Sequence, residues 1–294
     1  MTNTNKKSKN YLIRTITPTC LGIGKGEGFI DVPIARNSVN NLPILTGSSL
    51  KGILRQNAKE NNNKNIYEDF GPKDGSSQGI LSPQDAQILA LPVASGKGLF
   101  VWVTSPFLLN CFFNNLPNEI SKEIENIKIS DEQIIAANHV LFQDNNNKKN
   151  AIVGELYFLN LEDQEVLREN IAKIFANLYW KNVSSFKDDF IKRLSIVSDD
   201  VLSYFSVHAM DVRARNRLDD NRMATDQALW YEEAIPSMTL FWGNIGAQEL
   251  WQNGNESEKR KAEDALSDLK STQLQIGGKA SVGRGLIEFI VSES

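Results

Sequence analysis

Two hydroxyl side chains and two cations lie close together in the sequence PILTGSSLKGILR, residues 43–55. Ser48 and Ser49 precede apolar residues at helical spacing, so we expect a helix to begin here with a serine cap. Lys51 and Arg55 are four residues apart and therefore share one face of that helix. A helix N-terminus with nearby cations suits a phosphate backbone, although plain capping with solvated cations explains the same residues equally well.

A second candidate is the glycine-rich sequence LQIGGKASVGRGLIEF near the C-terminus. Its glycines lie between two strand-like runs, so a bulged hairpin is the simplest interpretation. The functional alternative is a loop whose backbone amides approach phosphates, helped by Lys279 and Arg284. The glycines are Gly277, Gly278, Gly283 and Gly285.

Other chemistry is limited by residue types and context. The earlier glycine cluster at residues 22–28 lacks both the strand–turn–helix context of a dinucleotide site and the Lys-Ser/Thr of a phosphate-binding loop. The two cysteines, Cys20 and Cys111, are far apart, which argues against a disulfide scaffold or a zinc ribbon. The two histidines, His139 and His208, do not form a paired-histidine metal motif.

Charged residues in the polar segment 208–230 follow the period of a strand. Arg213, Arg215 and Arg217 alternate, so all three share one face if the segment is extended. The adjacent Glu232 and Glu233 point to opposite faces of a strand, which argues against a close catalytic pair of carboxylates.

The charge of the 294-residue chain is unevenly distributed. The net charge of −4 argues against a uniformly basic nucleic-acid-binding protein. Residues 1–60 nevertheless hold nine cations and three anions, so this part carries +6 and the remainder carries −10. A basic segment in an acidic protein suggests a polyanionic partner, although a lysine-rich tail gives the same count.

The start of the chain and its hydropathy indicate a cytoplasmic protein. No stretch approaches ~20 apolar residues, so we expect no membrane span. The first ten residues, MTNTNKKSKN, are polar and read as a flexible tail rather than a secretory signal.

Periodicity and turn signals predict short helices interleaved with strands, which indicates the α+β class. The expected strands are residues 11–20, 99–105 and 238–245, followed by a strand–turn–strand unit at 274–292. The expected helices run from the serine cap to about Lys59, from the sequence SPQD at 82–85 onward, and over 162–180, 185–194 and 256–270.

Four blocks of sequence resemble the RAMP superfamily of CRISPR–Cas proteins, and their order resembles its backbone subunits from type III-B effector complexes. The blocks are FIDVPIARNSVNNLPILTGSSLKGILRQ, SPQDAQILALPVASGKGLFVWVTSP, LWYEEAIPSMTLFWGNI and LQIGGKASVGRGLIEF. The resemblance extends from about residue 20 to residue 290. GSSLKG and the glycine-rich loop are general to the superfamily, whereas the D-x-P-I sequence at 31–34, SPQDA and LWYEE-x-IP are more specific to this subunit.

The resemblance implies a ferredoxin-like, RRM-related palm with inserted helical elements and a protruding thumb β-hairpin at about 208–230, within a single domain over residues 11–294. It also implies several copies lined up along a guide RNA (crRNA), with each thumb kinking the guide–target duplex. An acidic loop residue then cleaves the target RNA beside the kink. The implied partners are crRNA, target RNA, further copies of this chain and the other subunits of the complex.

Site residues follow from the same resemblance, together with the cations near them. The catalytic residue is Asp31, which acts as a general base or helps hold a divalent metal, Mg²⁺ or Mn²⁺. The expected RNA-binding residues are Arg36, Gly47, Ser48, Ser49, Lys51, Arg55, Gly277, Gly278, Lys279 and Arg284. The thumb residues are Met210, Arg213, Arg215 and Arg217. One departure is that Cys20-Leu21-Gly22 stands where family members often have a histidine before the first glycine-rich loop.

Two rival functions fit the same sequence. The first is a purely architectural crRNA-binding subunit beside which another protein cuts. The second is a stand-alone endoribonuclease that processes guide precursors, which the scarcity of histidine disfavours.

Overall fold

Strand β1 (Lys7–Thr15) lies inside a sheet that is buried on both faces. The computed structural model describes residues 7–22, 29–72, 75, 77–114, 121–180, 184–216, 229–248 and 260–292. Tyr11 and Ile13 enter one hydrophobic core, whereas Leu12 enters the other. This alternation is the two-residue period of a strand, and it shows that the sheet separates two cores.

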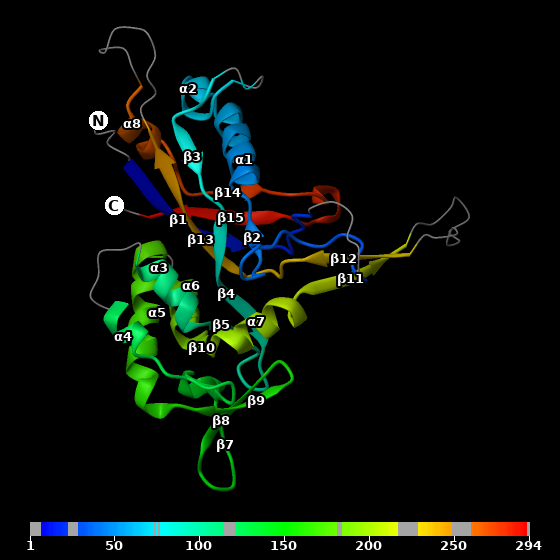
Figure 1. The fold of residues 1–294 in the computed structure, drawn as a ribbon, viewed down its shortest axis with the longest axis vertical. Coiled ribbons are helices and arrows are strands. Elements are labelled where there is room, and N and C mark those ends of the chain that lie inside the picture. The colour runs from blue at the N-terminus through cyan, green and yellow to red at the C-terminus, as the bar shows by residue number, and fades with distance from the viewer. Residues whose placement is uncertain are drawn as a thin grey trace.

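Four strands and two helices form the centre of the fold (Figure 1). In chain order they are β1, α1 (Gly47–Glu60), β4 (Ala86–Ala94), β13 (Leu240–Ala247), α8 (Ala262–Ser267) and β15 (Leu286–Val291). The strands lie in the order β4-β13-β1-β15, and every neighbouring pair is antiparallel. This βαββαβ arrangement is the ferredoxin-like one, which confirms the expected α+β palm.

Further strands extend this sheet at both ends. The full path is β10-β5-β4-β13-β1-β15-β14, with β2 paired to β4 and β3 paired to β13. The added strands are β2 (Ile44–Leu45), β3 (Leu81–Pro83), β5 (Phe100–Thr104), β10 (Leu194–Ile196) and β14 (Thr272–Gln275). The short helix α2 (Ile66–Phe70) follows α1.

A large insertion between β4 and β13 covers the second face of the sheet (Figure 1). Its helices are α3 (Pro106–Phe113), α4 (Ser121–Glu125), α5 (Glu165–Tyr179), α6 (Ser184–Arg193) and α7 (Asp199–His208). A small separate sheet contains β6 (Gln133–Ile134), β7 (Phe142–Gln143), β8 (Lys149–Val153) and β9 (Leu156–Asn160). Packed aromatic rings, including Trp102, Phe112, Phe175 and Phe190, fill the core under the helices.

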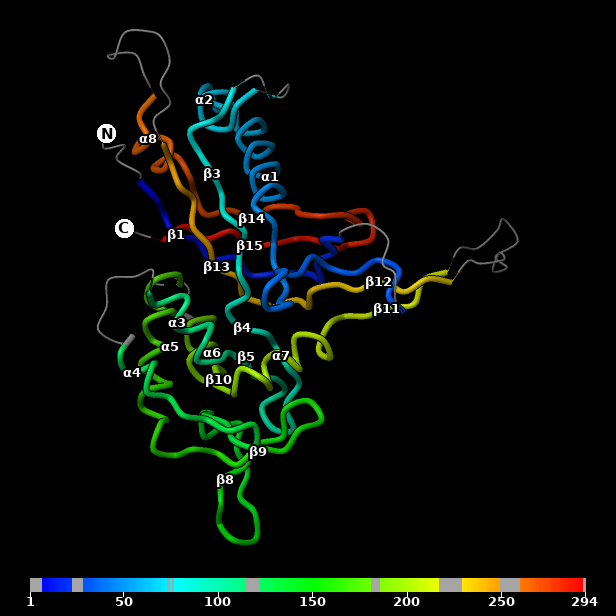
Figure 2. Tube along the Cα trace, viewed as in Figure 1, coloured from blue at the N-terminus to red at the C-terminus, as the bar shows by residue number. Residues whose placement is uncertain are grey.

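The expected thumb is a two-stranded hairpin that projects away from the sheet (Figure 2). Strand β11 (Asp211–Arg215) pairs antiparallel with β12 (Trp230–Ala234). Residues 217–228, including Arg217, lie outside the described residues. The hairpin therefore belongs to the insertion and joins the sheet only at its base.

Most of the predicted elements are present, with shifted ends. The strand predicted at 11–20 begins earlier, at Lys7, because Lys7 to Arg14 pair with β13. The helix predicted at 256–270 is reduced to α8, and residues 249–259 lie outside the described part. Across the described residues, no helix is both long and apolar enough to cross a membrane.

The helix predicted after SPQD is wrong, because β3 ends at Pro83 and β4 begins at Ala86. Side chains of β4 enter both cores, so this stretch is a strand buried on both faces. Asp85 does cap a helix, but a different one: its Oδ1 accepts the Gly47 N–H of α1 at 2.7 Å. Pro92, which would interrupt a helix, was the signal in the sequence.

Gly47 is required by close packing of the first turn of α1. A Cβ atom there would lie 2.3 Å from the carbonyl oxygen of Pro83, whereas one on Gly52 would meet nothing within 4 Å. We expect Gly47→Ala to lower the free energy of unfolding by about 1–3 kcal/mol through forced displacement of backbone. Gly52→Ala should raise it by about 0.5–1 kcal/mol, because alanine favours an exposed helix interior. Urea denaturation of both variants measures this, and equal effects would contradict the packing argument.

Candidate nucleic-acid interface

Three segments that are distant in the sequence meet at the base of the hairpin (Figure 2). Val32 forms a parallel bridge with Glu232 of β12, so the segment containing Asp31 runs alongside the hairpin. Cys20, in the segment that follows β1, forms a β-bridge with Gly278. This bridge places the C-terminal glycine-rich loop beside that segment. The predicted catalytic segment, thumb and glycine-rich loop are therefore neighbours.

Asp31 is held by the backbone of β12. Its N–H donates to the carbonyl oxygen of Tyr231 at 3.1 Å, and its Oδ2 accepts the Tyr231 N–H at 2.7 Å. The residue is exposed, and within the described part of the chain its second oxygen, Oδ1, has no hydrogen-bond partner. Phe29 stacks on the Tyr231 ring with centroids 4.5 Å apart, so an aromatic surface lies beside the carboxylate. Asp31 is thus fixed in position on β12 through its N–H and Oδ2.

Arg36 lies on the same segment and is bound within the protein. Its Nη2 is 2.6 Å from Oε1 of Glu233, and its Nη1 donates to the carbonyl oxygens of Asn41 and Ser206 at 3.1 Å. Oε2 of Glu233 accepts the Ile34 N–H at 3.0 Å. Because these contacts use most of the guanidinium, Arg36 fixes the Asp31 segment against β12 and has little capacity left for RNA.

Glu232 points to the other face of β12 and binds three donors. Oε1 accepts from Lys279 Nζ at 2.8 Å and from Trp230 Nε1 at 2.7 Å, and Oε2 is 3.3 Å from Arg215 Nε. Burial alone would raise the pKa of this carboxyl, but the hydrogen bonds from Lys279 and Trp230 and the charges of Lys279 and Arg215 hold the pKa below its ordinary value. A charged carboxylate, 2% exposed, therefore joins the hairpin to the glycine-rich loop.

The glycine-rich loop needs glycine at two positions for close packing. At Gly277, φ is +74° and a Cβ atom would lie 2.2 Å from the carbonyl oxygen of Cys20. At Gly285, φ is +85° and a Cβ atom would lie 2.1 Å from the carbonyl oxygen of Ile276. Around Gly278, in contrast, nothing lies within 4 Å of that position, so its backbone faces open space. The loop does join two antiparallel strands, β14 and β15, as the hairpin interpretation predicts, although no bulge interrupts their pairing. The Gly278 N–H donates to the carbonyl oxygen of Cys20 at 3.2 Å, and the space beside Gly278 is open.

Two predicted contact residues lie inside the protein. Arg284 is 3% exposed, and its Nη1 is 3.5 Å from Asp211 Oδ2 and 3.6 Å from Cys20 Sγ. Met210 is 8% exposed and packs in the hydrophobic core at the base of the hairpin. Neither side chain is on the RNA-accessible surface that the sequence led us to expect, because each is used to anchor the hairpin.

The alternating arginines share one face of β11, as predicted for an extended segment. Arg213 is exposed and donates to Asp211 Oδ1 at 2.9 Å. Arg215 reaches across the hairpin to Glu232. Of the pair, Arg213 has the greater freedom to contact a ligand.

The start of α1 differs in detail from the predicted serine cap. The N-cap residue is Thr46, whose side chain makes no capping bond, and the Gly47 N–H is already taken by Asp85. Ser49 Oγ lies 2.8 Å from Thr46 Oγ1, and Ser48 is exposed. Ser48 Oγ donates to the same Thr46 oxygen at 3.3 Å, so both serine hydroxyls are in the first turn and bond the side chain of the N-cap residue.

Lys51 and Arg55 are the cations of this region with the most freedom. Both are partly exposed, and among the described residues neither has a carboxylate within ion-pair distance. Arg55 Nε is buried without a hydrogen-bond partner. These two side chains form the positive face of α1 that the spacing predicted.

Several cations of the basic first 60 residues are neutralised by carboxylates from later in the chain. Lys7 pairs with Glu263, Arg14 with Glu288 at 2.9 Å, and Arg36 with Glu233. The +6 of this segment is therefore partly cancelled by folding. The predicted cations are therefore divided: Arg36, Lys279 and Arg284 are in ion pairs within the protein, whereas Lys51 and Arg55 on α1 have no carboxylate partner among the described residues.

The described residues contain no group of three or more His, Cys, Asp or Glu side chains able to hold a metal ion. Asp31 offers one carboxylate, of which Oδ2 already accepts a hydrogen bond. These residues do not fit a resident metal held by protein ligands, since a divalent cation needs about six oxygens.

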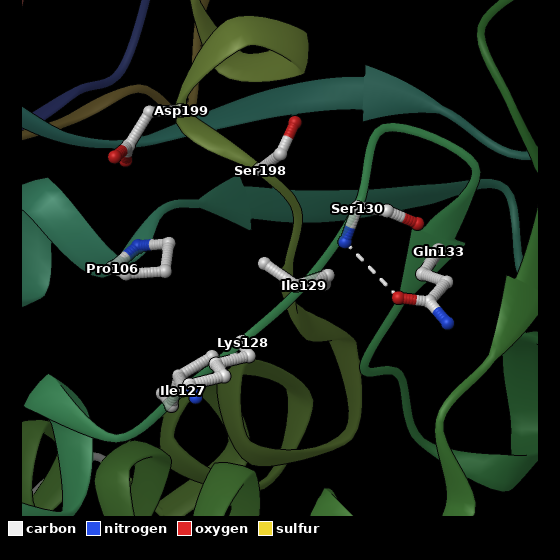
Figure 3. A pocket seen from close by; sticks show the side chains of 8 residues that line it. All are labelled: Pro106, Ile127, Lys128, Ile129, Ser130, Gln133, Ser198 and Asp199. Carbon is white, nitrogen blue, oxygen red and sulfur yellow. Dashed lines mark hydrogen bonds between the residues drawn. The ribbon is translucent and has the colours of Figure 1, made fainter.

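A shallow pocket of about 500 Å³ opens elsewhere, between α3, the segment 127–133 and the start of α7 (Figure 3). Two of its polar side chains are already paired: Gln133 Oε1 accepts the Ser130 N–H, and Asp199 Oδ1 accepts the Phe107 N–H, each at 3.0 Å. None of the predicted site residues lines it. This pocket is therefore separate from the interface at the hairpin.

Glu232 and Glu233 are the functional residues that reasoning from sequence missed. They do point to opposite faces, as predicted, but each is a buried partner for a different loop. Two adjacent acidic residues in a strand with an aromatic and apolar sequence, LWYEEAIP, were the available signal, because buried carboxylates require cationic or amide partners.

The chain is similar to proteins of one family. The model of the RAMP superfamily matches residues 12–288. The CRISPR system Cmr endoribonuclease Cmr4 of Pyrococcus furiosus is 30% identical over 97% of this chain and 96% of the relative. The crystal structure of oligomeric Cmr4 from Pyrococcus furiosus superposes with a TM-score of 0.70 at 26% identity, covering 97% of this chain and 98% of that one.

The fold is also shared with a chain in the cryo-EM structure of the type III-B Cmr-beta complex bound to cognate target RNA. The TM-score is 0.72 at 20% identity, with 97% of each chain covered. At this identity the likeness concerns the fold alone.

Glu232→Gln tests the charged state of the buried carboxylate. At pH 7 we expect the variant to lose about 1–3 kcal/mol of unfolding free energy, because hydrogen bonds to an ionised group are lost. Folding lowers the pKa of Glu232, so its contribution to the unfolding free energy is complete above the ordinary glutamate pKa of about 4.3. That contribution is lost as the pH falls through the lower pKa of the folded state. The difference between wild type and variant should therefore shrink from pH 5 to pH 2–3. Urea denaturation measures it, with exposed Glu125→Gln as the control, and a difference independent of pH would contradict the ionised state.

Proposed function

The chain belongs to the RAMP superfamily, and from this premise we propose that it is a crRNA-binding backbone subunit of a type III-B CRISPR effector complex that cleaves target RNA. Copies of the chain line up along the guide, and each hairpin kinks the guide–target duplex. The partners are crRNA, target RNA, neighbouring copies and the other Cmr subunits. The 30% identity to the Cmr endoribonuclease Cmr4, over almost the full length of both chains, supports this assignment.

The observation that best supports cleavage is the position of Asp31 on β12. An exposed carboxylate, with one oxygen fixed by a backbone N–H and the other without a partner among the described residues, is held beside a projecting hairpin. A hairpin that displaces a nucleotide would leave the adjoining phosphodiester kinked. The carboxylate then lies where the kinked linkage passes.

The proposed chemistry uses the RNA as its own nucleophile. The 2′-hydroxyl attacks the adjacent phosphorus while Asp31 takes its proton as a general base. The bond to the 5′ oxygen breaks, that oxygen takes a proton from water, and the products end in a 2′,3′-cyclic phosphate and a 5′-hydroxyl. Holding the attacking and leaving oxygens in line supplies a large part of the rate enhancement.

The guide backbone is proposed to follow α1 and the glycine-rich loop. Ser48 and Ser49 in the first turn of α1, with Lys51 and Arg55 on its face, offer donors and positive charge to phosphates. Gly278 has the open space that a close approach of phosphate to backbone requires.

A divalent metal, Mg²⁺ or Mn²⁺, is proposed to assist cleavage. Asp31 Oδ1 is the protein atom available to it, and RNA phosphate oxygens with water would supply the remaining ligands. When bound, such an ion would stabilise negative charge on the phosphate oxygens. The protein's own part is to fix Asp31 and to hold the RNA.

An architectural role without catalysis is the second candidate. The bond between Asp31 Oδ2 and the Tyr231 N–H is one that a purely structural loop aspartate also makes, and this observation favours it. Asp31→Asn separates the two roles, because asparagine keeps an oxygen acceptor for Tyr231 but is a poor general base.

In the assembled complex, we expect Asp31→Asn to lower the cleavage rate of complementary RNA by at least ~100-fold, with guide and target binding unchanged. Asp31→Ala should lower the cleavage rate by at least as much, and it should also loosen the segment that contains residue 31, because the bond to the Tyr231 N–H is lost. A 2′-deoxy nucleotide at the cleavage position should block cutting at that position. Gel analysis of end-labelled RNA measures all three.

The matched control is Asp163→Asn, an exposed aspartate on the helical insertion, which should cleave as wild type does. If Asp31→Asn also cleaves as wild type does while binding is intact, Asp31 is not the base and the architectural role is correct.

Lys51→Met tests the path of the guide along α1. Removing one phosphate contact should weaken crRNA binding and reduce the slope of log K against log salt by about one. Arg55→Met should act in the same way, whereas exposed Lys270→Met on the α8 side should not. Filter binding at several salt concentrations measures the slopes, and unchanged slopes for both α1 variants would place the guide elsewhere.

A further inference from the structure

We propose that the two cations of the glycine-rich loop, Lys279 and Arg284, are a clamp that sets the orientation of the hairpin and are not RNA ligands. Lys279 forms an ion pair with Glu232 of β12, and Arg284 forms one with Asp211 of β11. The inference rests on the proposed function only for its consequence in cleavage. The clamp itself is a property of the protein without RNA.

The hairpin is already held on its opposite face, where Arg36 pairs with Glu233 of β12. Its two strands form a separate two-stranded sheet that shares no strand with the central one. At its base, β12 bridges Val32, and the residue after it, Ile235, bridges Thr19. Backbone pairing at one edge of β12 and the Arg36–Glu233 pair on one face leave the face that carries Asp211 and Glu232 to be held by the glycine-rich loop.

The contact of Lys279 with Glu232 supplies the first contact between the loop and this face. The backbone of Lys279 has φ +69°, a left-handed conformation that is unfavourable for lysine. This conformation accompanies a side chain that reaches Glu232 at 2.8 Å and lies over the Trp230 ring, 5.9 Å from its centroid. The ammonium group is thus bound to β12 in the protein without RNA.

The contact of Arg284 with Asp211 supplies the second, on the other strand. Arg284 is buried beneath the loop, and its Nη2 has no hydrogen-bond partner. A phosphate cannot reach a guanidinium at that depth without opening the loop. Its ion pair with Asp211, together with the contact to Cys20, instead joins the loop, the end of β1 and the hairpin.

The two pairs act on the same face of the hairpin. Asp211 and Glu232 lie on that face because Asp211, Arg213 and Arg215 alternate along β11 and Arg213 is in register with Glu232. A loop with two cations therefore holds both strands at once, and two contacts restrict the tilt of the hairpin more than one contact does. Lys279 and Arg284 are positioning residues, and they transmit the placement of the loop to the hairpin beside Asp31.

Hydrogen exchange of the RNA-free protein tests the clamp directly. We expect Lys279→Met and Glu232→Gln each to increase exchange of the β11 and β12 amides by about tenfold or more, since each removes a charge-assisted bond. The double variant should be no worse than the single ones, because both remove one interaction. Lys279→Arg should restore protection, and Asp211→Asn should loosen β11 in the same way. Exposed Lys270→Met is the matched control and should leave the hairpin as in wild type.

The assembled complex then separates a clamp from a phosphate contact. As a clamp, Lys279→Met leaves the salt slope of crRNA binding unchanged, and Glu232→Gln, which removes no cation, reproduces its effects: target cleavage slowed about tenfold and spread over neighbouring positions. The proposal is overturned if hairpin exchange is unchanged in both variants. It is equally overturned if Lys279→Met lowers the salt slope by about one while Glu232→Gln behaves as wild type.

Failure of the clamp and failure of the proposed function give different results. If wild-type complex does not cleave RNA but the variants loosen the hairpin, the function is wrong and the clamp stands. If wild-type complex cleaves and the hairpin is unaffected by either variant, the clamp alone is wrong.

Discussion

The ionised carboxylate of Glu232 is the interaction on which the interface at the hairpin depends. It is almost fully buried, and such a charge is stable only when donors surround it. Lys279, Trp230 and Arg215 meet that requirement from two separate segments. Because the penalty for an unpaired buried charge is large, the glycine-rich loop and the hairpin are obliged to stay together, and the left-handed backbone at Lys279 is tolerated for the same reason.

Folding redistributes the charge that the sequence displays. The basic first 60 residues suggested a positive surface, but Lys7, Arg14 and Arg36 are used in ion pairs with carboxylates far along the chain. On α1, Lys51 and Arg55 have no ion-pair partner among the described residues. A net charge of −4 gives no general affinity for polyanions, so any phosphate contact depends on local groups such as the side chains of Lys51 and Arg55 and the open backbone at Gly278.

The sequence predicted what depends on local periodicity and failed where long-range contacts decide. The α1 helix and the β15 strand followed from spacing and turn residues, whereas the β11–β12 hairpin followed from the family resemblance. The SPQD helix did not form, because Asp85 caps α1 from a distance of 38 residues and β4 is buried on both faces. The burial of Arg284 and Met210 could not be deduced either, since composition does not reveal which cation finds an internal carboxylate. Family resemblance supplied Asp31, and the geometry added the glutamates that position its segment.

The alternation of side chains along β12 explains how one strand can align two loops. Glu232 and Glu233 are consecutive, so they project to opposite faces of the strand. One binds the glycine-rich loop through Lys279, and the other binds the Asp31 segment through Arg36 and the Ile34 N–H. The loop expected to hold the guide and the loop expected to cut the target are therefore both bound to the same strand, β12. A displacement of the hairpin must move both contacts together, so the glycine-rich loop and the segment that contains Asp31 keep a fixed relation to β12.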